Sequence, residues 1–316
     1  MDARARALNI RLVGFSTYAE LLAAGLTRAR IRVMVRRGEL ISLSRGVYIT
    51  SELADRLRLL PAGETAMRAM GVLATLRAGS VVSHHTAAEL HGLDLLSQAP
   101  VLSISRPPAV GSRSAKPGVL VHAAELPAGH VGGRFGVPCT TVPRTVVDLA
   151  RELEFRDGVV VADSALRQRL TSKKELRQVL AECPRWPGVS RAASVVEFAD
   201  GLAESVLESI ARVAFRDLGL PAPELQVPIT DEEFIGRVDF LWRRFRTIAE
   251  VDGALKYDDR ARARAQLRRD KRLRAAGYEV EHFDWREIMY APTEVGRSLQ
   301  VAFRRGGHLP ESGPAA

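Results

Sequence analysis

Three acidic residues near the end of the chain have the types and the spacing that a divalent-cation site needs. Asp239 lies in one strand-like run, and Glu250 and Asp252 lie two residues apart in the next. Residues i and i+2 of a strand project from the same face, and an antiparallel neighbour can bring Asp239 alongside them. Clustered carboxylates on an apolar sheet repel one another and lose hydration, and a hard cation relieves both costs. The pattern therefore predicts a Mg²⁺ or Mn²⁺ ion that activates water for phosphodiester hydrolysis.

The segments around these acids follow one another in a characteristic order. They are ESVLES, GLPAPELQV, GRVDFLW, EVDG followed by KY, and a basic helix that ends in AAGYEV. On these motifs the region resembles the PD-(D/E)XK restriction-endonuclease-like superfamily, and within it the branch related to very-short-patch-repair endonucleases. The resemblance implies that Asp239, Glu250 and the Val251 carbonyl bind the metal ion. It also implies that Glu208 orients a metal-bound water and that Gln226 lies near the site.

One position departs from the superfamily pattern, because Asp252 stands where a lysine is usual. An aspartate offers no positive charge to the attacking hydroxide or to the phosphate. The very-short-patch branch often carries an acid there, and Lys256 can return a cation to the scissile phosphate. Two alternatives remain: a degenerate site that binds DNA without cutting it, and surface acids that bind no metal. Acids that lie far apart, or an arginine salt-bridged into their pocket, would leave only a binding protein.

Histidines and cysteines offer further chemistry. His282 lies on the strand after the basic helix, where it can act as a base if its side chain faces the acids. His84, His85 and His91 lie close together in the sequence, but no cysteine is near them. We interpret them as packing or capping residues at a helix N-terminus rather than as zinc ligands. Cys139 lies in a buried-strand pattern and is not expected to be a nucleophile.

The elements that must position the acids run through residues 188–307 in the order α-β-β-β-α-β-α. Their first part is the α-β-β-β-α-β core of a restriction-endonuclease-like fold. Residues 53–187 predict a mixed α/β segment of helices and short strands, which ends at the linker CPRWPG. Residues 308–316 are expected to form a flexible tail. The chain is therefore interpreted as a multi-domain α/β protein.

Residues 1–52 predict a winged helix-turn-helix domain. Thr27 caps a helix that stops at Gly38, and the hairpin-like run ELISLSRGVYIT follows. The second helix of such a domain enters the major groove of DNA. This segment resembles the winged-helix domain of AbiEi-type antitoxins of type IV toxin–antitoxin systems, and residues 53–187 resemble the region that follows it there. The resemblance implies DNA and a cognate toxin as partners. The residues expected to bind DNA are Arg28, Arg32, Arg36 and, at the wing tip, Arg45.

The charge distribution supports a polyanionic partner. The 316-residue chain carries 46 basic and 37 acidic residues, a net charge of +9. Positive charge is concentrated in residues 1–50 and 260–274, and the rest of the chain is net negative. This distribution suits a protein that contacts nucleic acid phosphates at two separate places. The alternative is that these arginines form ordinary solvated faces. No run is apolar enough to span a membrane, and we expect a cytoplasmic protein. The basic helix adds the predicted DNA contacts Arg262, Arg268, Arg269 and Arg272.

Overall fold

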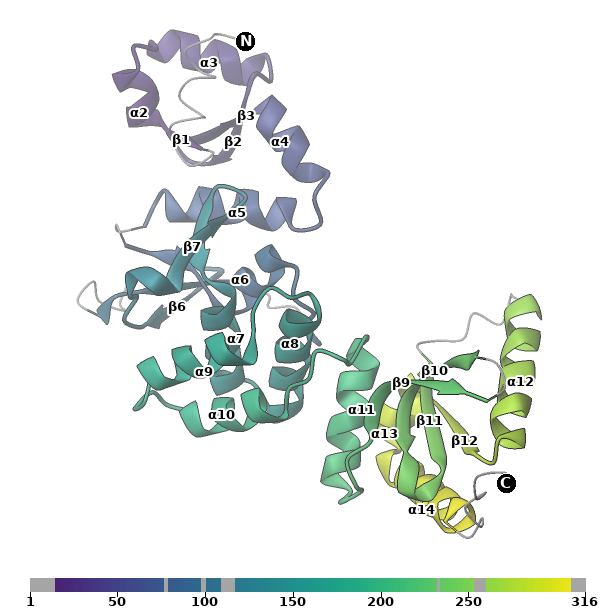
Figure 1. Cartoon of the computed structure of the whole chain (residues 1–316). Helices are drawn as coiled ribbons and strands as arrows, with labels where there is room; N and C mark the ends of the chain where they lie inside the picture. Colours follow the sequence, from purple (N-terminus) through teal and green to yellow (C-terminus); the bar gives the residue numbers. More distant parts are fainter. Residues whose placement is uncertain are drawn as a thin grey trace. The chain divides into compact units, whose positions relative to one another are not determined.

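The computed structural model describes residues 15–76, 79–97, 101–108, 117–231, 234–252 and 260–307. These residues form helices and three β-sheets (Figure 1), so the expected mixed α/β class is confirmed. The chain divides into two compact units. The first comprises the described residues up to Val161 together with Leu170–Glu197, and the second comprises Ala162–Arg169 together with the described residues from Phe198 onward. None of the described helices is both long and apolar enough to cross a membrane.

The first unit begins with a small antiparallel sheet whose strand order is β1-β3-β2. Thr17 and Thr27 are the N-caps of its first two helices, and each hydroxyl accepts a backbone hydrogen bond three residues on. Ile31 and Met34 are buried, so one face of the second helix packs inward and the opposite face is left to solvent. The elements are β1 (Ser16–Thr17), α2 (Tyr18–Ala23), α3 (Arg28–Arg36), β2 (Leu40–Ser44) and β3 (Val47–Thr50).

The remainder of the first unit surrounds a mixed five-stranded sheet with the order β6-β5-β4-β8-β7. Its strands are β4 (Val81–Val82), β5 (Leu102–Arg106), β6 (Val119–Ala123), β7 (Val131–Arg134) and β8 (Val137–Thr140). Its helical segments are α4 (Ser51–Arg58), α5 (Gly63–Leu73), α6 (His84–His91), the 3₁₀ turn η2 (Ala128–His130), α7 (Val142–Glu152), the first part of α8 (Phe155–Arg167), α9 (Lys173–Glu182) and α10 (Val189–Phe198) without its last residue. The part of α8 from Ala162 onward belongs to the second unit.

One hydrophobic core joins the first two segments of the sequence. Ile49 and Ala54, from the end of the N-terminal sheet and the helix after it, pack in the same buried cluster as Val82 and Cys139 of the five-stranded sheet. From the sequence, a domain boundary is expected between residues 52 and 53. The structure places both segments in one unit, because their apolar side chains bury one another.

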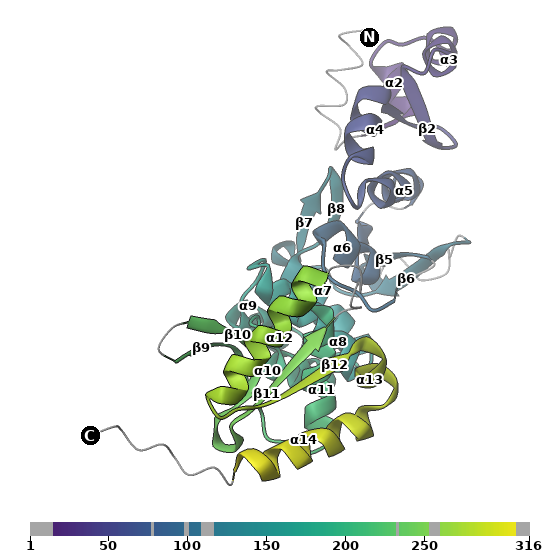
Figure 2. The same ribbon diagram turned by 90° about the vertical axis from the view of Figure 1, so that its right-hand side faces the viewer.

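The second unit has a four-stranded sheet with the order β12-β11-β10-β9. Strands β9 to β11 are antiparallel, whereas β12 runs parallel to β11. The views in Figures 1 and 2 show α12 on one face of the sheet and α11 on the other. The order of elements agrees with the sequence expectation, with two further short helical segments, η3 and α13. The elements are α11 (Val206–Asp217), β9 (Glu224–Thr230), β10 (Phe234–Trp242), η3 (Arg243–Phe245), β11 (Thr247–Asp252), α12 (Arg260–Ala275), β12 (Glu279–Asp284), α13 (Trp285–Tyr290) and α14 (Pro292–Gly306).

Candidate functional site

Two of the predicted site carboxylates meet at a single amide group. Glu208 lies in the first turn of α11, and Asp239 lies on β10. The Nε2 atom of Gln226, on β9, donates to Glu208 Oε2 at 2.8 Å and to Asp239 Oδ1 at 3.2 Å. Glu208 also accepts hydrogen bonds from the Glu204 amide and the Ser205 hydroxyl, so it closes the loop that enters α11 as well. The structure thus brings Glu208, Gln226 and Asp239 together, as the sequence analysis expects.

The sheet opens where these carboxylates lie. Strands β10 and β11 pair from Trp242 opposite Thr247 to Phe240 opposite Ala249. The pairing ends there, so Asp239 has no paired residue on β11. Asp239 Oδ2 instead accepts the Val251 backbone amide at 3.0 Å, so a side chain replaces the ladder hydrogen bond. Gln226 stands opposite Asp239 with φ of +52°, a conformation that non-glycine residues rarely adopt. A strained backbone conformation of this kind persists only where contacts with the surrounding residues enforce it. Such conformations are found most often at functional sites.

The third predicted carboxylate already has a cationic partner. Arg269 of α12 donates from Nη1 to Glu250 Oε2 at 2.7 Å, and its Nη2 lies 2.7 Å from Oε1. The second contact is an ion pair without hydrogen-bond geometry, and Oε1 is buried with no hydrogen-bond donor among the described residues. A Cβ atom on Gly236 would lie 2.4 Å from Arg269 Nε, so the glycine makes room for this guanidinium. Arg269, predicted to contact DNA phosphates, is therefore engaged inside the acidic cluster.

Burial is the largest influence on the charge of these acids. It raises the pKa of Glu208, Asp239 and Glu250, because their ionised forms lose hydration. Neighbouring carboxylates add to the effect, and Arg269 opposes it at Glu250. Such a donor set suits a hard divalent cation at Glu208 and Asp239. At Glu250 the fit is poor, since an arginine holds the place that a cation would take. An arginine salt-bridged into the acidic pocket counts against hydrolysis.

The other predicted residues lie at the edge of this cluster or outside it. Asp252 accepts a hydrogen bond from Gln266 Nε2 at 3.3 Å and lies 3.7 Å from His282 Nδ1. His282 pairs in register with Glu250 across the parallel strands β11 and β12, but its Nε2 lies 2.9 Å from Asp270 Oδ2. The imidazole is therefore beside the acids and held by another carboxylate. Lys256 lies outside the described residues.

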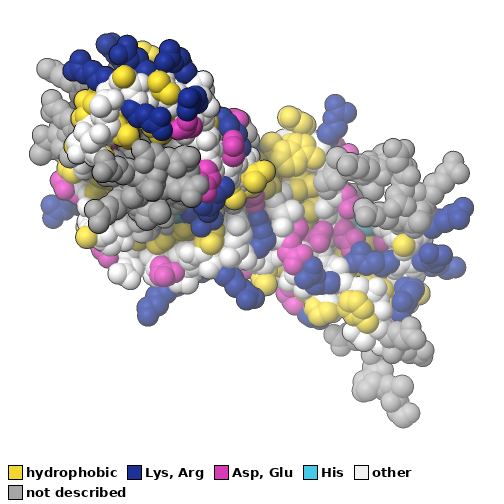
Figure 3. All heavy atoms as spheres, turned by 90° about the horizontal axis from the view of Figure 1, so that it is seen from above, with side chains coloured by type: hydrophobic (Ala, Val, Ile, Leu, Met, Phe, Trp, Pro, Cys, Tyr) yellow, Lys and Arg dark blue, Asp and Glu magenta, His cyan; other side chains and the backbone are white. Residues whose placement is uncertain are grey.

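The arginines predicted for the N-terminal helix share one solvent-facing side. Arg28, Arg32 and Arg36 of α3 are exposed, as is Arg45 in the turn between β2 and β3. Within the described ranges, none of the four has an acidic partner at ion-pair distance. Figure 3 shows lysine and arginine side chains gathered at this end of the first unit. On α12, Arg268 and Arg272 are exposed, whereas the side chain of Arg262 lies outside the part described.

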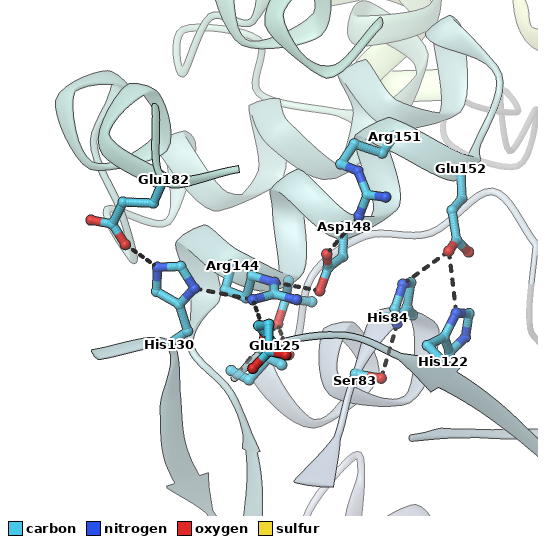
Figure 4. A network of polar contacts seen from close by, with 12 residues as sticks. Ser83, His84, His122, Glu125, His130, Arg144, Asp148, Arg151, Glu152 and Glu182 are labelled. Carbon is cyan, nitrogen blue, oxygen red and sulfur yellow. Dashed lines mark hydrogen bonds and ion pairs between the residues drawn. The ribbon is translucent and has the colours of Figure 1, made fainter. Parts of the chain in front are cut away.

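A second cluster was missed by the sequence analysis. The carboxylate of Glu152, at the end of α7, lies against the imidazoles of His84 and His122. Figure 4 shows the three side chains converging from different elements. The sequence groups His84 with His85 and His91 instead, because they are neighbours along the chain. The histidine His122 in a short predicted strand is a possible metal ligand, but the neighbouring sequence does not indicate which residues its side chain faces.

No protein-family model matches the chain. Two proteins of Mycobacterium tuberculosis are each 31% identical to it over 294 residues, covering 90% of this chain and 97% of the relative: uncharacterized protein MT2308 of strain CDC 1551 / Oshkosh and uncharacterized protein Rv2248 of strain H37Rv. The crystal structure of the RV2827C protein from the same species matches with a TM-score of 0.36 and 19% identity, over 62% of this chain and 77% of that chain. A structural similarity of that size does not establish a shared fold.

Proposed function

The chain belongs to the same family as the proteins MT2308 and Rv2248 of Mycobacterium tuberculosis, and we propose that it binds duplex DNA through the exposed arginines of α3. In this proposal the N-terminal sheet and its helices form a winged helix-turn-helix. Helix α3 is the recognition helix, and the turn between β2 and β3 is the wing. The chain then acts as a non-catalytic DNA-binding regulator of the kind that the resemblance to AbiEi-type antitoxins implies.

The observation that carries this proposal is the charge on the outer face of α3. Arg28, Arg32 and Arg36 are spaced four residues apart, so they form one stripe along the helix. Elsewhere in the unit, exposed arginines such as Arg58 and Arg177 are paired with acids at 2.7 Å and 2.9 Å. The charge of a guanidinium without an acidic neighbour is not offset locally and is available to phosphates, and each contact with a phosphate releases counterions from the DNA.

A binding titration tests the proposal. Fluorescence anisotropy of a labelled duplex is measured in EDTA with the full chain, the Arg32→Ala/Arg36→Ala variant and the Arg58→Ala/Arg177→Ala variant. Both variants remove two positive charges from exposed positions, but only the first removes them from α3. We expect the α3 variant to lose at least about tenfold in affinity, or ~1.4 kcal/mol, while the control stays close to the parent. Equal losses in the two variants would mean that α3 is not the interface.

A second candidate function is Mg²⁺- or Mn²⁺-dependent phosphodiester hydrolysis by a restriction-endonuclease-like second unit. The convergence of Glu208 and Asp239 at Gln226 favours it. The ion pair between Glu250 and Arg269 counts against it. Hydrolysis therefore requires Arg269 to leave Glu250, and we place this function second to DNA binding.

Cleavage of supercoiled plasmid with Mg²⁺ or Mn²⁺ separates the two candidates. The parent chain is compared with Asp239→Ala and with Arg269→Ala. If the second unit is a nuclease, the parent nicks the plasmid and Asp239→Ala does not. If the site is degenerate, neither the parent nor Asp239→Ala cuts the plasmid, and both still bind DNA in EDTA.

A further inference from the structure

Three side chains from distant parts of the first unit converge on one point. His84 is the first residue of α6, His122 lies on β6, and Glu152 lies at the end of α7. His84 Nε2 and His122 Nδ1 each lie 3.2 Å from the same carboxylate oxygen, Glu152 Oε1. One potential ligand atom from each residue lies within 4.8 Å of those of the other two. The cluster is far in sequence from the acids of the second unit, and it is independent of the function proposed above.

The two nitrogen–oxygen separations match the spacing of neighbouring ligands around a small tetrahedral ion. Zinc lies about 2.0–2.1 Å from nitrogen and oxygen ligands, which puts neighbouring ligand atoms about 3.3 Å apart. The two nitrogen–oxygen distances of 3.2 Å are close to that edge length. Imidazole nitrogens favour zinc and related transition metals, whereas Mg²⁺ prefers oxygen ligands alone. The donor set therefore selects a different metal from the acidic cluster on β10 and β11.

His84 is held in place at a cost to the backbone. Its φ is +50°, and its side chain is only 3% exposed. A left-handed conformation at a non-glycine residue costs on the order of 1–3 kcal/mol and persists where the surroundings impose it. Ser83 Oγ lies 2.9 Å from His84 Nδ1, so the hydroxyl can accept from this nitrogen while Nε2 remains free to bind a metal.

Glu152 is suited to serve as the anionic ligand. A glutamate side chain supplies a negatively charged oxygen, and Glu152 Oε1 already faces a nitrogen of each imidazole at 3.2 Å. Glu152 is also the most exposed of the three side chains, so an ion can reach it from solvent.

The cluster borders a pocket of about 310 Å³ within the first unit. Besides the three residues, its lining includes Ala123, Arg151 and Trp186. Three protein ligands that face a pocket leave a coordination position for water or another small ligand, the pattern of zinc sites with an open position. The rings of His84 and His122 stack with their planes 14° apart, so one ring must turn for both nitrogens to face a shared ion. His122 lies on β6, the edge strand of the sheet, and is the less buried of the two.

We propose that His84, His122 and Glu152 bind a single Zn²⁺-like transition-metal ion, with one coordination position open to the adjoining pocket.

The test measures metal binding by the tag-free full chain after removal of metals with a chelator. Zn²⁺ is titrated in competition with a chromophoric chelator, and Co²⁺ is added separately so that its visible spectrum reports the geometry. The parent chain is expected to bind one Zn²⁺ tightly, to give a tetrahedral Co²⁺ spectrum, and to keep its Zn²⁺ in excess Mg²⁺. No stoichiometric Zn²⁺ or Co²⁺ binding by the parent would overturn the proposal without any variant.

Substitutions then assign the ligands. His122→Ala and Glu152→Gln are expected to weaken Zn²⁺ binding by more than about 100-fold, and Ser83→Ala, which removes only a partner of a ligand, by about 10-fold. The matched control is His85→Gln, because His85 is the next residue in the chain and lines a different pocket. Parent-like affinity in both His122→Ala and Glu152→Gln, or an equal loss in His85→Gln, would show that the metal binds elsewhere. Circular dichroism checks that each variant is folded.

Discussion

The guanidinium of Arg269 lies against the carboxylate of Glu250, with Nη1 2.7 Å from Oε2 and Nη2 2.7 Å from Oε1. The arginine comes from the basic helix α12 and the glutamate from the central strand β11. A positive charge at this point relieves the repulsion among Glu208, Glu250 and the partly buried Asp239, as a divalent cation would. We predict that the strength of this ion pair sets how tightly the second unit can bind a divalent metal.

Gly236→Ala is predicted to move Arg269 without unfolding the unit. A Cβ at this position would collide with the flexible end of the arginine rather than with backbone, so the side chain can shift away. Glu250 then loses its cationic partner and is free to bind a metal. We expect Mn²⁺ affinity, measured by calorimetry, to rise by about tenfold, and to rise similarly in Arg269→Ala. Unchanged affinity in both variants would show that the pair does not limit metal binding.

The stability of the second unit is predicted to depend on pH through Asp239. Burial raises the pKa of this carboxyl, so the folded state holds its proton more tightly than the unfolded state. The contribution of Asp239 to stability is thus present at pH values below its unfolded pKa, about 3.9, and is lost as pH rises through the folded pKa. The free energy of unfolding of the parent minus that of Asp239→Asn is expected to fall as pH rises through this interval. Denaturant titrations across that range measure the difference, and a flat or rising profile contradicts the burial effect.

Arg212 and Asp163 form a buried ion pair in the second unit that is predicted to be essential for its stability. Arg212 Nη1 lies 2.7 Å from Asp163 Oδ2, and the two side chains are 9% and 0% exposed. Removing one partner leaves a buried group uncompensated, so Arg212→Ala is expected to cost about 3–5 kcal/mol. Arg216→Ala, one turn further along the same helix and exposed, is expected to cost less than about 1 kcal/mol. Urea unfolding of both variants tests the contrast, which fails if their midpoints coincide.

Much of the fold could be predicted because its signals are local. Thr27 and Gly38 mark the ends of α3 by capping chemistry, and strand-like runs separated by turn residues mark β10 and β11. The proximity of Asp239 to the end of β11 follows from two antiparallel strands joined by a short connection. That the N-terminal residues form a winged-helix domain and the second unit a nuclease-like domain stays a prediction.

The remaining features depend on contacts that sequence spacing does not reveal. His122 meets His84 and Glu152 only because β6 pairs with β5 at the edge of the sheet, and no local pattern sets that register. Arg269 reaches Glu250 because α12 crosses the sheet beside Gly236. A glycine in the middle of a strand indicates a close approach, but it does not identify the approaching residue. The shared core of the first two segments likewise depends on tertiary packing.

The salt dependence of DNA binding tests the central claim most directly. The affinity of the parent chain and of Arg32→Ala/Arg36→Ala for one duplex is measured in EDTA over a range of salt concentrations. Each lost phosphate contact lowers the slope of log K against log salt concentration by about 0.9, so the variant slope is expected to be smaller by nearly 2. The Arg58→Ala/Arg177→Ala control is expected to keep the parent slope. Parallel lines for the parent and the α3 variant would contradict DNA binding by α3.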